Sequence, residues 1–138
     1  MEQSTELKEL YLRCCEAQSS GDYSFFERHF SQKDGVVAIG TDPTEWWDGY
    51  ATITRVFKAQ LKETGGFEIL AGTPQAYSDG SVGWVAGQPT VKLQDGTEIP
   101  VRLTAVFQRE QKDWKIVQWH FSMGISNEDS IGETLTTQ

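Results

Sequence analysis

The sequence predicts an α+β fold in which a curved, mostly antiparallel sheet wraps around three N-terminal helices to form a cone with a central pocket. Apolar residues recur at helical spacing only in the first half of the chain, and strand-like segments joined by short turns fill most of the second half. The length of 138 residues suits one domain with one core. We expect this domain to span residues 1–125 and to be followed by an acidic tail at 126–138.

Three helices are expected before the sheet. The first should span residues 5–19, with Ser4 or Thr5 as its cap and Gly21 as its stop. The second is the segment YSFFERHF, whose phenylalanines face inward. The third begins near Tyr50, carries one apolar stripe, and ends at a Gly-Gly pair. All three would cover one face of the sheet.

The strands are predicted from β-branched and aromatic runs bounded by turn residues. A short strand, VVAIG, lies between the second and third helices, and the segment GTDPTEWWDGY after it has the composition of a loop. Short turns separate four longer strands, so antiparallel hairpins are expected. These four strands are predicted at Phe67–Tyr77, Val82–Leu93, Glu98–Glu110 and Lys115–Gly124.

The closing segment WKIVQWHFSMG is the stretch around which the fold is organised. Strict alternation would place Trp114, Ile116 and His120 on one face, and Trp119 and Phe121 on the other. We expect the second face to look into a hollow that the third helix closes. His120 then lies on the outer face of the sheet.

Composition excludes several classes of function. The net charge of −8 would repel nucleic acid and anionic membranes, and no apolar run is long enough for a membrane span. The N-terminus is charged, unlike a signal peptide. Cys14 and Cys15 are neighbours on a helix and are expected to stay reduced, which favours a cytoplasmic location. No metal-ligand spacing occurs, and no cofactor is expected.

The segments DPTEWW and WKIVQWHFS resemble those of the SnoaL-like branch of the nuclear transport factor 2-like superfamily, which shares its fold with ketosteroid isomerase. The resemblance covers nearly the whole chain and implies a cone-shaped α+β barrel that forms a homodimer through the outer face of its sheet. The superfamily also contains cyclases, dehydratases, kinase association domains and non-catalytic members. The resemblance therefore predicts the fold and leaves the function open.

Catalytic residues of ketosteroid isomerase have no counterpart here. That enzyme needs a carboxylate base, together with a tyrosine and a protonated aspartate that form an oxyanion hole. The corresponding positions fall near Ile39, Cys14 and Thr104. The arginines of the kinase association domain would fall at Ala105 and Phe121. Steroid isomerisation and that type of anion site are therefore not expected.

A small set of aromatic and polar residues forms the predicted ligand site. The aromatic rings would supply apolar wall area, and Gln88 or Asp42 would orient the ligand. Each ring has an alternative role as core, and the Trp pair could instead fill the cone and cover the dimer interface. The predicted residues are Trp46, Trp47, Tyr50, Trp84, Gln88, Trp119, Phe121 and Asp42.

Three functions remain open at this point. The first is a small homodimeric protein that binds a hydrophobic, aromatic or polycyclic small molecule in its cone. The second is an isomerase, dehydratase or cyclase that uses Asp42 or His120 as its acid or base, although Asp42 could simply cap a turn and Glu45 could simply be solvated. The third is a dimerisation or assembly module whose cone is filled by side chains.

Overall fold

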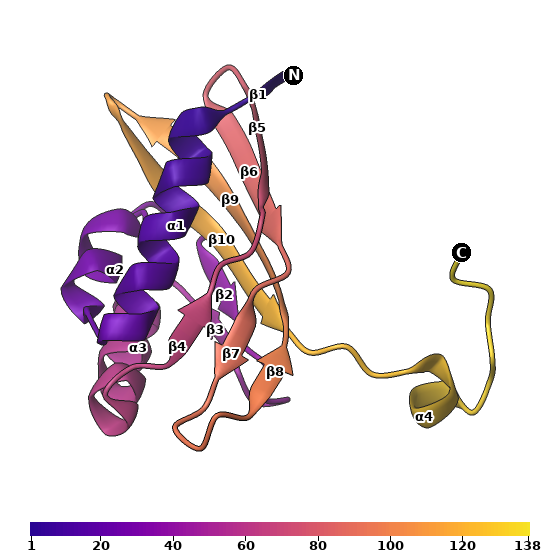
Figure 1. Cartoon of the computed structure of the whole chain (residues 1–138). Helices are drawn as coiled ribbons and strands as arrows, with labels where there is room; N and C mark the ends of the chain where they lie inside the picture. The colour runs from indigo at the N-terminus through magenta and orange to yellow at the C-terminus, as the bar shows by residue number, and fades with distance from the viewer.

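The computed structural model describes residues 1–138 and has the predicted α+β architecture, with helices covering the concave face of a curved sheet (Figure 1). The elements in chain order are β1 (Glu2–Gln3), α1 (Thr5–Ser20), α2 (Tyr23–His29), β2 (Val37–Ile39), β3 (Trp46–Asp48), α3 (Tyr50–Thr64), β4 (Glu68–Leu70), β5 (Gln75–Asp79), β6 (Val82–Gly87), β7 (Thr90–Lys92), β8 (Glu98–Pro100), β9 (Arg102–Glu110), β10 (Asp113–Ser122) and α4 (Asn127–Ile131).

Local capping fixes the ends of the helices. The Ser4 side chain accepts a hydrogen bond from the Leu7 N–H at the start of α1, and Gly21 ends this helix in the left-handed conformation at φ 75°. Asp22 caps α2 in the same way through the N–H of Phe25. Gly65 ends α3 at φ 72°. The helices therefore lie within a residue or two of the ranges predicted from the sequence.

The predicted long strands are wrong in one respect, because three of the four are broken in two. A proline lies in or directly beside each break: Pro74 precedes β5, Pro89 lies between β6 and β7, and Pro100 is the last residue of β8. A proline has no N–H with which to continue a ladder of hydrogen bonds. The pieces belong to different sheets. The larger sheet has the order β1-β5-β6-β9-β10-β2-β3, and the smaller one has the order β4-β7-β8.

A second correction concerns the segment predicted as a loop after the short strand. Residues Trp46–Asp48 form the strand β3, which pairs antiparallel with β2, and β2 itself runs parallel to β10. The N–H of Gly40 donates to the carbonyl of Glu45 at 2.9 Å and closes this hairpin. Adjacent tryptophans on a strand point to opposite faces, so Trp46 and Trp47 cannot share one role.

A β-bulge changes the predicted faces of β10. The register with β9 shifts between Ile116 and Gln118, so Val117 is the extra residue. Trp114 and Ile116 are consequently buried like Trp119, although strict alternation put them on the opposite face. From Gln118 onward the prediction is correct: Trp119 is buried and His120 is exposed.

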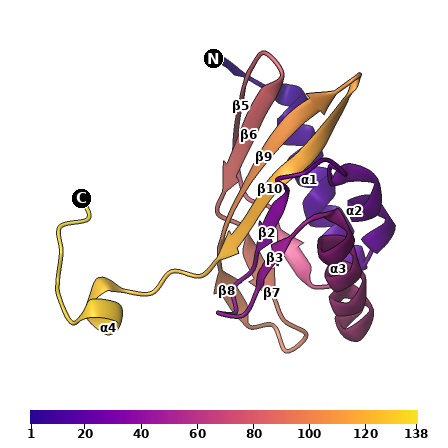
Figure 2. The same ribbon diagram turned by 180° about the vertical axis from the view of Figure 1, so that it is seen from behind.

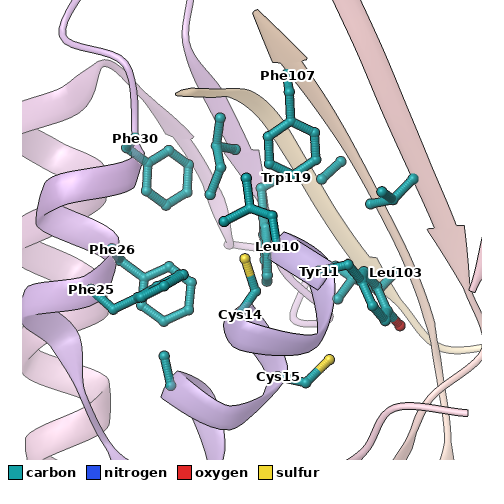
Figure 3. Packing of buried hydrophobic residues seen from close by; sticks show 14 of the residues in the cluster. Leu10, Tyr11, Cys14, Cys15, Phe25, Phe26, Phe30, Leu103, Phe107 and Trp119 are labelled. Atoms are coloured by element: carbon teal, nitrogen blue, oxygen red, sulfur yellow. The ribbon is translucent and has the colours of Figure 1, made fainter. Parts of the chain in front are cut away.

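The core is aromatic where the sheet meets the helices. Figure 3 shows Phe26 from α2 and Phe30, the residue that follows this helix, lying towards the sheet residue Trp119. The Trp119 ring packs edge-on against Phe26, Phe30 and Phe57 at centroid distances of 5.7, 6.4 and 6.1 Å. Such contacts add about 0.5–1.5 kcal/mol each beyond simple burial, so this cluster fixes the position of the Trp119 ring.

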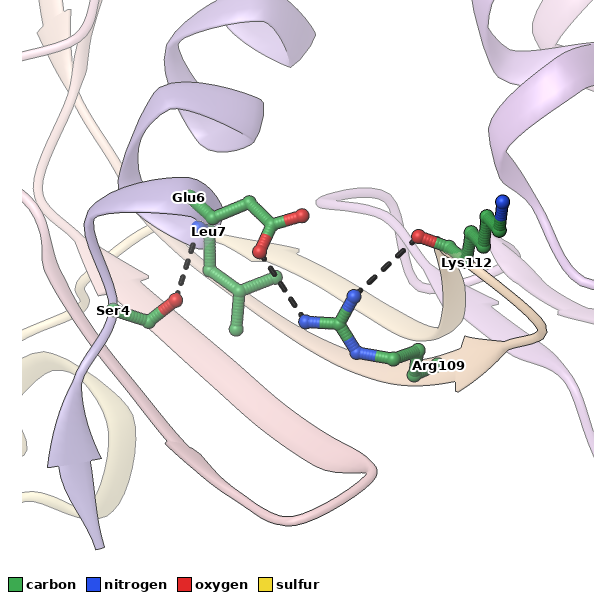
Figure 4. A network of polar contacts seen from close by, with 5 residues as sticks. All are labelled: Ser4, Glu6, Leu7, Arg109 and Lys112. Atoms are coloured by element: carbon green, nitrogen blue, oxygen red, sulfur yellow. Dashed lines mark hydrogen bonds and ion pairs between the residues drawn. The ribbon is translucent and has the colours of Figure 1, made fainter.

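The two ends of the chain differ in how they are held. At the N-terminal end, Ser4 caps α1, and an ion pair at 3.2 Å between Glu6 and Arg109 connects this helix to β9 (Figure 4). Both partners are exposed, and such pairs contribute at most about 1 kcal/mol. At the C-terminal end, the chain leaves the sheet and extends away from the domain (Figure 2). The tail contains the short helix α4, which the sequence did not predict and which buries no residue.

Candidate functional site

A cavity of about 430 Å³ lies where the wide end of the curved sheet meets α3. Its walls come from α3, the β2–β3 hairpin, the small sheet and the end of β10. Thirteen of its twenty lining residues are hydrophobic. Both the volume and this apolar lining are typical of small-molecule sites. The cone of this protein is therefore hollow.

The aromatic wall includes three of the residues predicted from the sequence. Trp47, Trp119 and Phe121 all line the cavity, together with Phe57 from α3. Phe57 lies between the two indoles, with its ring centroid 6.2 Å from that of Trp47 and 6.1 Å from that of Trp119. Residues 119 and 121 of the sheet and Phe57 of the third helix therefore border the same cavity.

The structure places the other aromatic predictions outside the cavity lining. Trp46 is 62% exposed, because it occupies the outward position on β3. The Tyr50 hydroxyl donates to the Glu27 carbonyl at 2.6 Å and so connects α3 to α2. Trp84 lies on the outer face of β6, where its ring packs against Tyr77 at 5.1 Å.

The predicted polar residues also lie away from the cavity. Gln88 is exposed in the break between β6 and β7. Asp42 is fully exposed and accepts hydrogen bonds from the N–H and hydroxyl of Thr44 at 2.9 and 2.6 Å. The bond from the Thr44 hydroxyl, followed by that from its N–H, holds the pKa of Asp42 below its usual value. Asp42 therefore builds a turn, which was its alternative role.

Two of the polar residues in the cavity lining, which were not among the predicted ligand-site residues, are hydrogen-bonded to each other. The Glu45 carboxylate accepts from the Gln60 side-chain amide at 2.7 Å and from the Asp42 N–H at 2.9 Å. Gln60 follows Phe57 by three residues on α3, so the helical stripe that predicted Phe57 and Leu61 could have pointed to it. Glu45 was named from the sequence only as a carboxylate that could simply be solvated, because its direction depends on the hairpin that the sequence did not predict.

The ionisable side chains of the cavity are of one sign. Glu45 and Glu63 line it, and no lysine, arginine or histidine does. The last turn of α3, which carries Gln60, Glu63 and Thr64, also lies in the wall. A helix C-terminus carries a partial negative charge, so the polar part of the cavity is electronegative.

The buried titratable groups lie in the core and do not line the cavity. Burial raises the pKa of the Cys15 thiol to about 11 and raises that of Cys14 further. Burial likewise raises the pKa of Tyr11, whose hydroxyl has no hydrogen-bond partner. These groups are therefore kept neutral, and none of them forms a reactive site.

Neither a metal site nor a membrane span is visible. The His, Cys, Asp and Glu side chains form no group of three or more that could hold a metal ion. Not one of the helices has the length and apolar character needed to cross a membrane.

A helix-covered, curved α+β sheet with a cavity at its wide end defines the nuclear transport factor 2-like class, which is also called the cystatin-like fold. Residues 7–126 match the SnoaL-like domain, and the chain belongs to this family. No curated protein matches the sequence.

Solved structures with the same fold are distant in sequence. One is an NTF2-like protein of unknown function from Pseudomonas putida KT2440, with 18% identity, a TM-score of 0.75, and coverage of 99% of this chain and 98% of the other. Another is a superfamily member from Salmonella enterica, with 17% identity, a TM-score of 0.73 and coverage of 94% and 95%. A third, from Streptomyces avermitilis, is provisionally assigned as a dehydratase, with 16% identity, a TM-score of 0.71 and coverage of 86% and 94%. These similarities establish the fold alone.

Proposed function

We propose that this protein binds a hydrophobic small molecule with an aromatic or polycyclic body in the cavity of its cone. The observation that carries the proposal is an open cavity of about 430 Å³ whose wall includes Trp47, Phe57, Trp119 and Phe121. A buried planar ligand would gain roughly 25 cal/mol for each Å² of apolar surface removed from water. The rings are held by one another, so little reorganisation is needed on binding.

The two alternatives have less support. Neither of the acid–base candidates, Asp42 and His120, lines the cavity, and both side chains are exposed. An enzyme of the proposed isomerase, dehydratase or cyclase type would need another acid or base. A filled assembly module is disfavoured by the cavity volume itself. The binding function is the one that uses the features present.

Saturable binding by the intact protein tests the proposal. Calorimetric titration with 2-naphthalenemethanol, a planar apolar compound, should give a dissociation constant below millimolar. Val91→Phe adds bulk to the cavity wall and should weaken binding by about tenfold, which corresponds to about 1.4 kcal/mol. Val56→Phe is the matched control, because Val56 lies on α3 outside the cavity lining and is only partly buried. Absence of saturable binding across a panel of planar apolar compounds would refute the function.

The proposed oligomer is a homodimer formed through the outer face of the larger sheet. Val82 is exposed there, beside the Tyr77–Trp84 ring pair. An apolar sheet face of this kind is normally covered by a partner. Sedimentation should show a dimer at micromolar concentration, and Trp84→Glu should give a folded monomer. A monomeric wild-type protein would refute the proposed dimer.

We also propose a cytoplasmic location. The two buried free thiols support a reducing setting of this kind.

A further inference from the structure

The Glu45 carboxylate is held in the cavity wall with hydrogen-bonding capacity to spare. Its Oε2 accepts from Gln60 Nε2 at 2.7 Å, and its Oε1 accepts from the Asp42 N–H at 2.9 Å. A carboxylate offers about four acceptor sites, so about two remain for a ligand. The two existing bonds come from different elements, α3 and the β2–β3 hairpin. They orient the group before any ligand arrives.

Close packing of the hairpin contributes to this orientation. Gly40 lies against the Glu45 side chain, and a Cβ at Gly40 would fall 2.6 Å from Oε1 and 2.9 Å from both Cβ and Cδ of Glu45. The carboxylate therefore occupies space that any larger residue at position 40 would take. This arrangement fixes one acceptor group at the edge of an otherwise apolar hollow.

The charges around the cavity select the charge of a ligand. Glu63 is the other ionisable side chain of the lining, and no cationic side chain is present to neutralise an acid. The C-terminal turn of α3 adds its partial negative charge, while Lys62 in that turn does not line the cavity. The net charge of the chain is −8. An anionic ligand would meet repulsion from all of these, whereas a cation would be attracted.

The aromatic wall suits a cation that is attached to an apolar body. Trp47, Phe57 and Trp119 line the same hollow that Glu45 borders. Aromatic faces attract ammonium groups, and indole does so best. The same rings supply the apolar surface for the remainder of the ligand.

We propose that the ligand of this cavity is an amphipathic amine, with an aromatic or polycyclic body against the rings and a protonated nitrogen that donates to Glu45. This assignment rests on the proposed function and names the end group of its ligand. Glu45 is then the residue that determines specificity. Gln60 and Gly40 position it.

Three probes that share one body test the assignment. These are 2-naphthylmethylamine, 2-naphthalenemethanol and 2-naphthoate, which are cationic, neutral and anionic and are each titrated calorimetrically into the full chain. The wild-type protein should bind the amine about tenfold more tightly than the alcohol, and the carboxylate least, because charge-assisted hydrogen bonds are about twice as strong as neutral ones. Glu45→Gln should remove about this tenfold advantage of the amine and leave the affinity for the alcohol unchanged.

Two further measurements test how charge acts at the site. Glu63→Gln removes the exposed carboxylate of the lining, which makes no hydrogen bond, and should leave the preference for the amine in place. Added salt should weaken wild-type binding of the amine and not of the alcohol, and this measurement needs no variant.

The outcomes distinguish the two proposals. If 2-naphthoate binds as tightly as the amine, or if Glu45→Gln keeps the full preference for the amine, the ammonium assignment is overturned and an apolar binding function still stands. If none of the three probes binds saturably below millimolar, the proposed function itself fails. A preference for the amine that disappears in Glu45→Gln and persists in Glu63→Gln supports the assignment.

Discussion

The contact between Gly40 and Glu45 can be measured without any ligand, through the stability of the protein. In Gly40→Ala the new Cβ would lie 2.6 Å from Oε1 and 2.9 Å from the Cβ of Glu45. Turning the carboxylate alone does not clear it, because the Glu45 Cβ is also too close. We therefore expect the whole side chain to move and to lose its hydrogen bonds to Gln60 and to the Asp42 N–H.

The expected magnitude follows from these two bonds. Each contributes about 0.5–1.5 kcal/mol net, and partial exposure favours the lower values, so the loss is about 1–2 kcal/mol. Replacing glycine lowers the entropy of the unfolded chain and returns about 0.4–1 kcal/mol, since Gly40 does not have a positive φ. The net destabilisation of Gly40→Ala should be about 1 kcal/mol.

A double-mutant cycle with Glu45→Ala isolates the contact. Once the side chain is gone, Gly40→Ala has nothing to displace and should be neutral or slightly stabilising, which gives a coupling energy of about 1–2 kcal/mol. Urea unfolding followed by tryptophan fluorescence measures all four proteins. Gly124→Ala is the control, because its Cβ would meet only Arg102, at 3.8 Å or more. Additive losses in the cycle, or a neutral Gly40→Ala in the wild-type background, would show that the carboxylate is not held as described.

Three further predictions concern the core, the cavity and the tail. Cys14 and Cys15 should not react with Ellman's reagent at pH 8 until the protein is unfolded. Because burial raises the pKa of Cys15 from 9.0 to about 11, the unfolded chain releases this proton first, and the free energy of unfolding should fall as the pH rises through that interval in urea titrations. Phe107→Ala should lower the free energy of unfolding by about 3–5 kcal/mol with no effect on ligand affinity. Phe121→Ala, at a half-buried position in the cavity wall, should destabilise the protein less and should weaken ligand binding. Equal effects of the two substitutions on stability and on affinity would contradict this division. Truncation after Ile125 should leave the melting temperature unchanged, and a clear drop would show that the tail packs on the domain.

The helices could be predicted from the sequence because their signals are local. Ser4, Gly21 and Gly65 act within a turn of their own backbone, so reading neighbouring residues was sufficient. Pro89 and Pro100 also indicate the breaks in the strands, but the apolar residues on either side of them favoured the prediction of continuous strands. A proline inside a strand-like run deserves more weight than the hydrophobic residues that flank it.

The site could be predicted only in part, for a different reason. Alternation along β10 gave Trp119 and Phe121 correctly, yet it failed upstream, where the bulge at Val117 inserts one residue. A bulge depends on the pairing with β9, which no single segment reveals. Glu45 is the extreme case, because its direction is set by β2, α3 and a turn together. The polar part of a site depends on such long-range placement far more than its apolar wall does.

The position of Phe57 explains how one set of rings can serve both the core and the cavity. Its ring packs against Phe26 of α2 and Phe30 directly after that helix at 5.0 and 5.3 Å, and against Trp47 and Trp119 of the cavity wall. The α2 side of this cluster is buried by folding, and the other side borders the hollow. Packing against the buried core therefore fixes the rings of the cavity wall, so a ligand gains apolar contact without having to order these side chains. It follows that Phe57→Ala should reduce stability and ligand affinity together, which distinguishes it from substitutions confined to either side of the cluster.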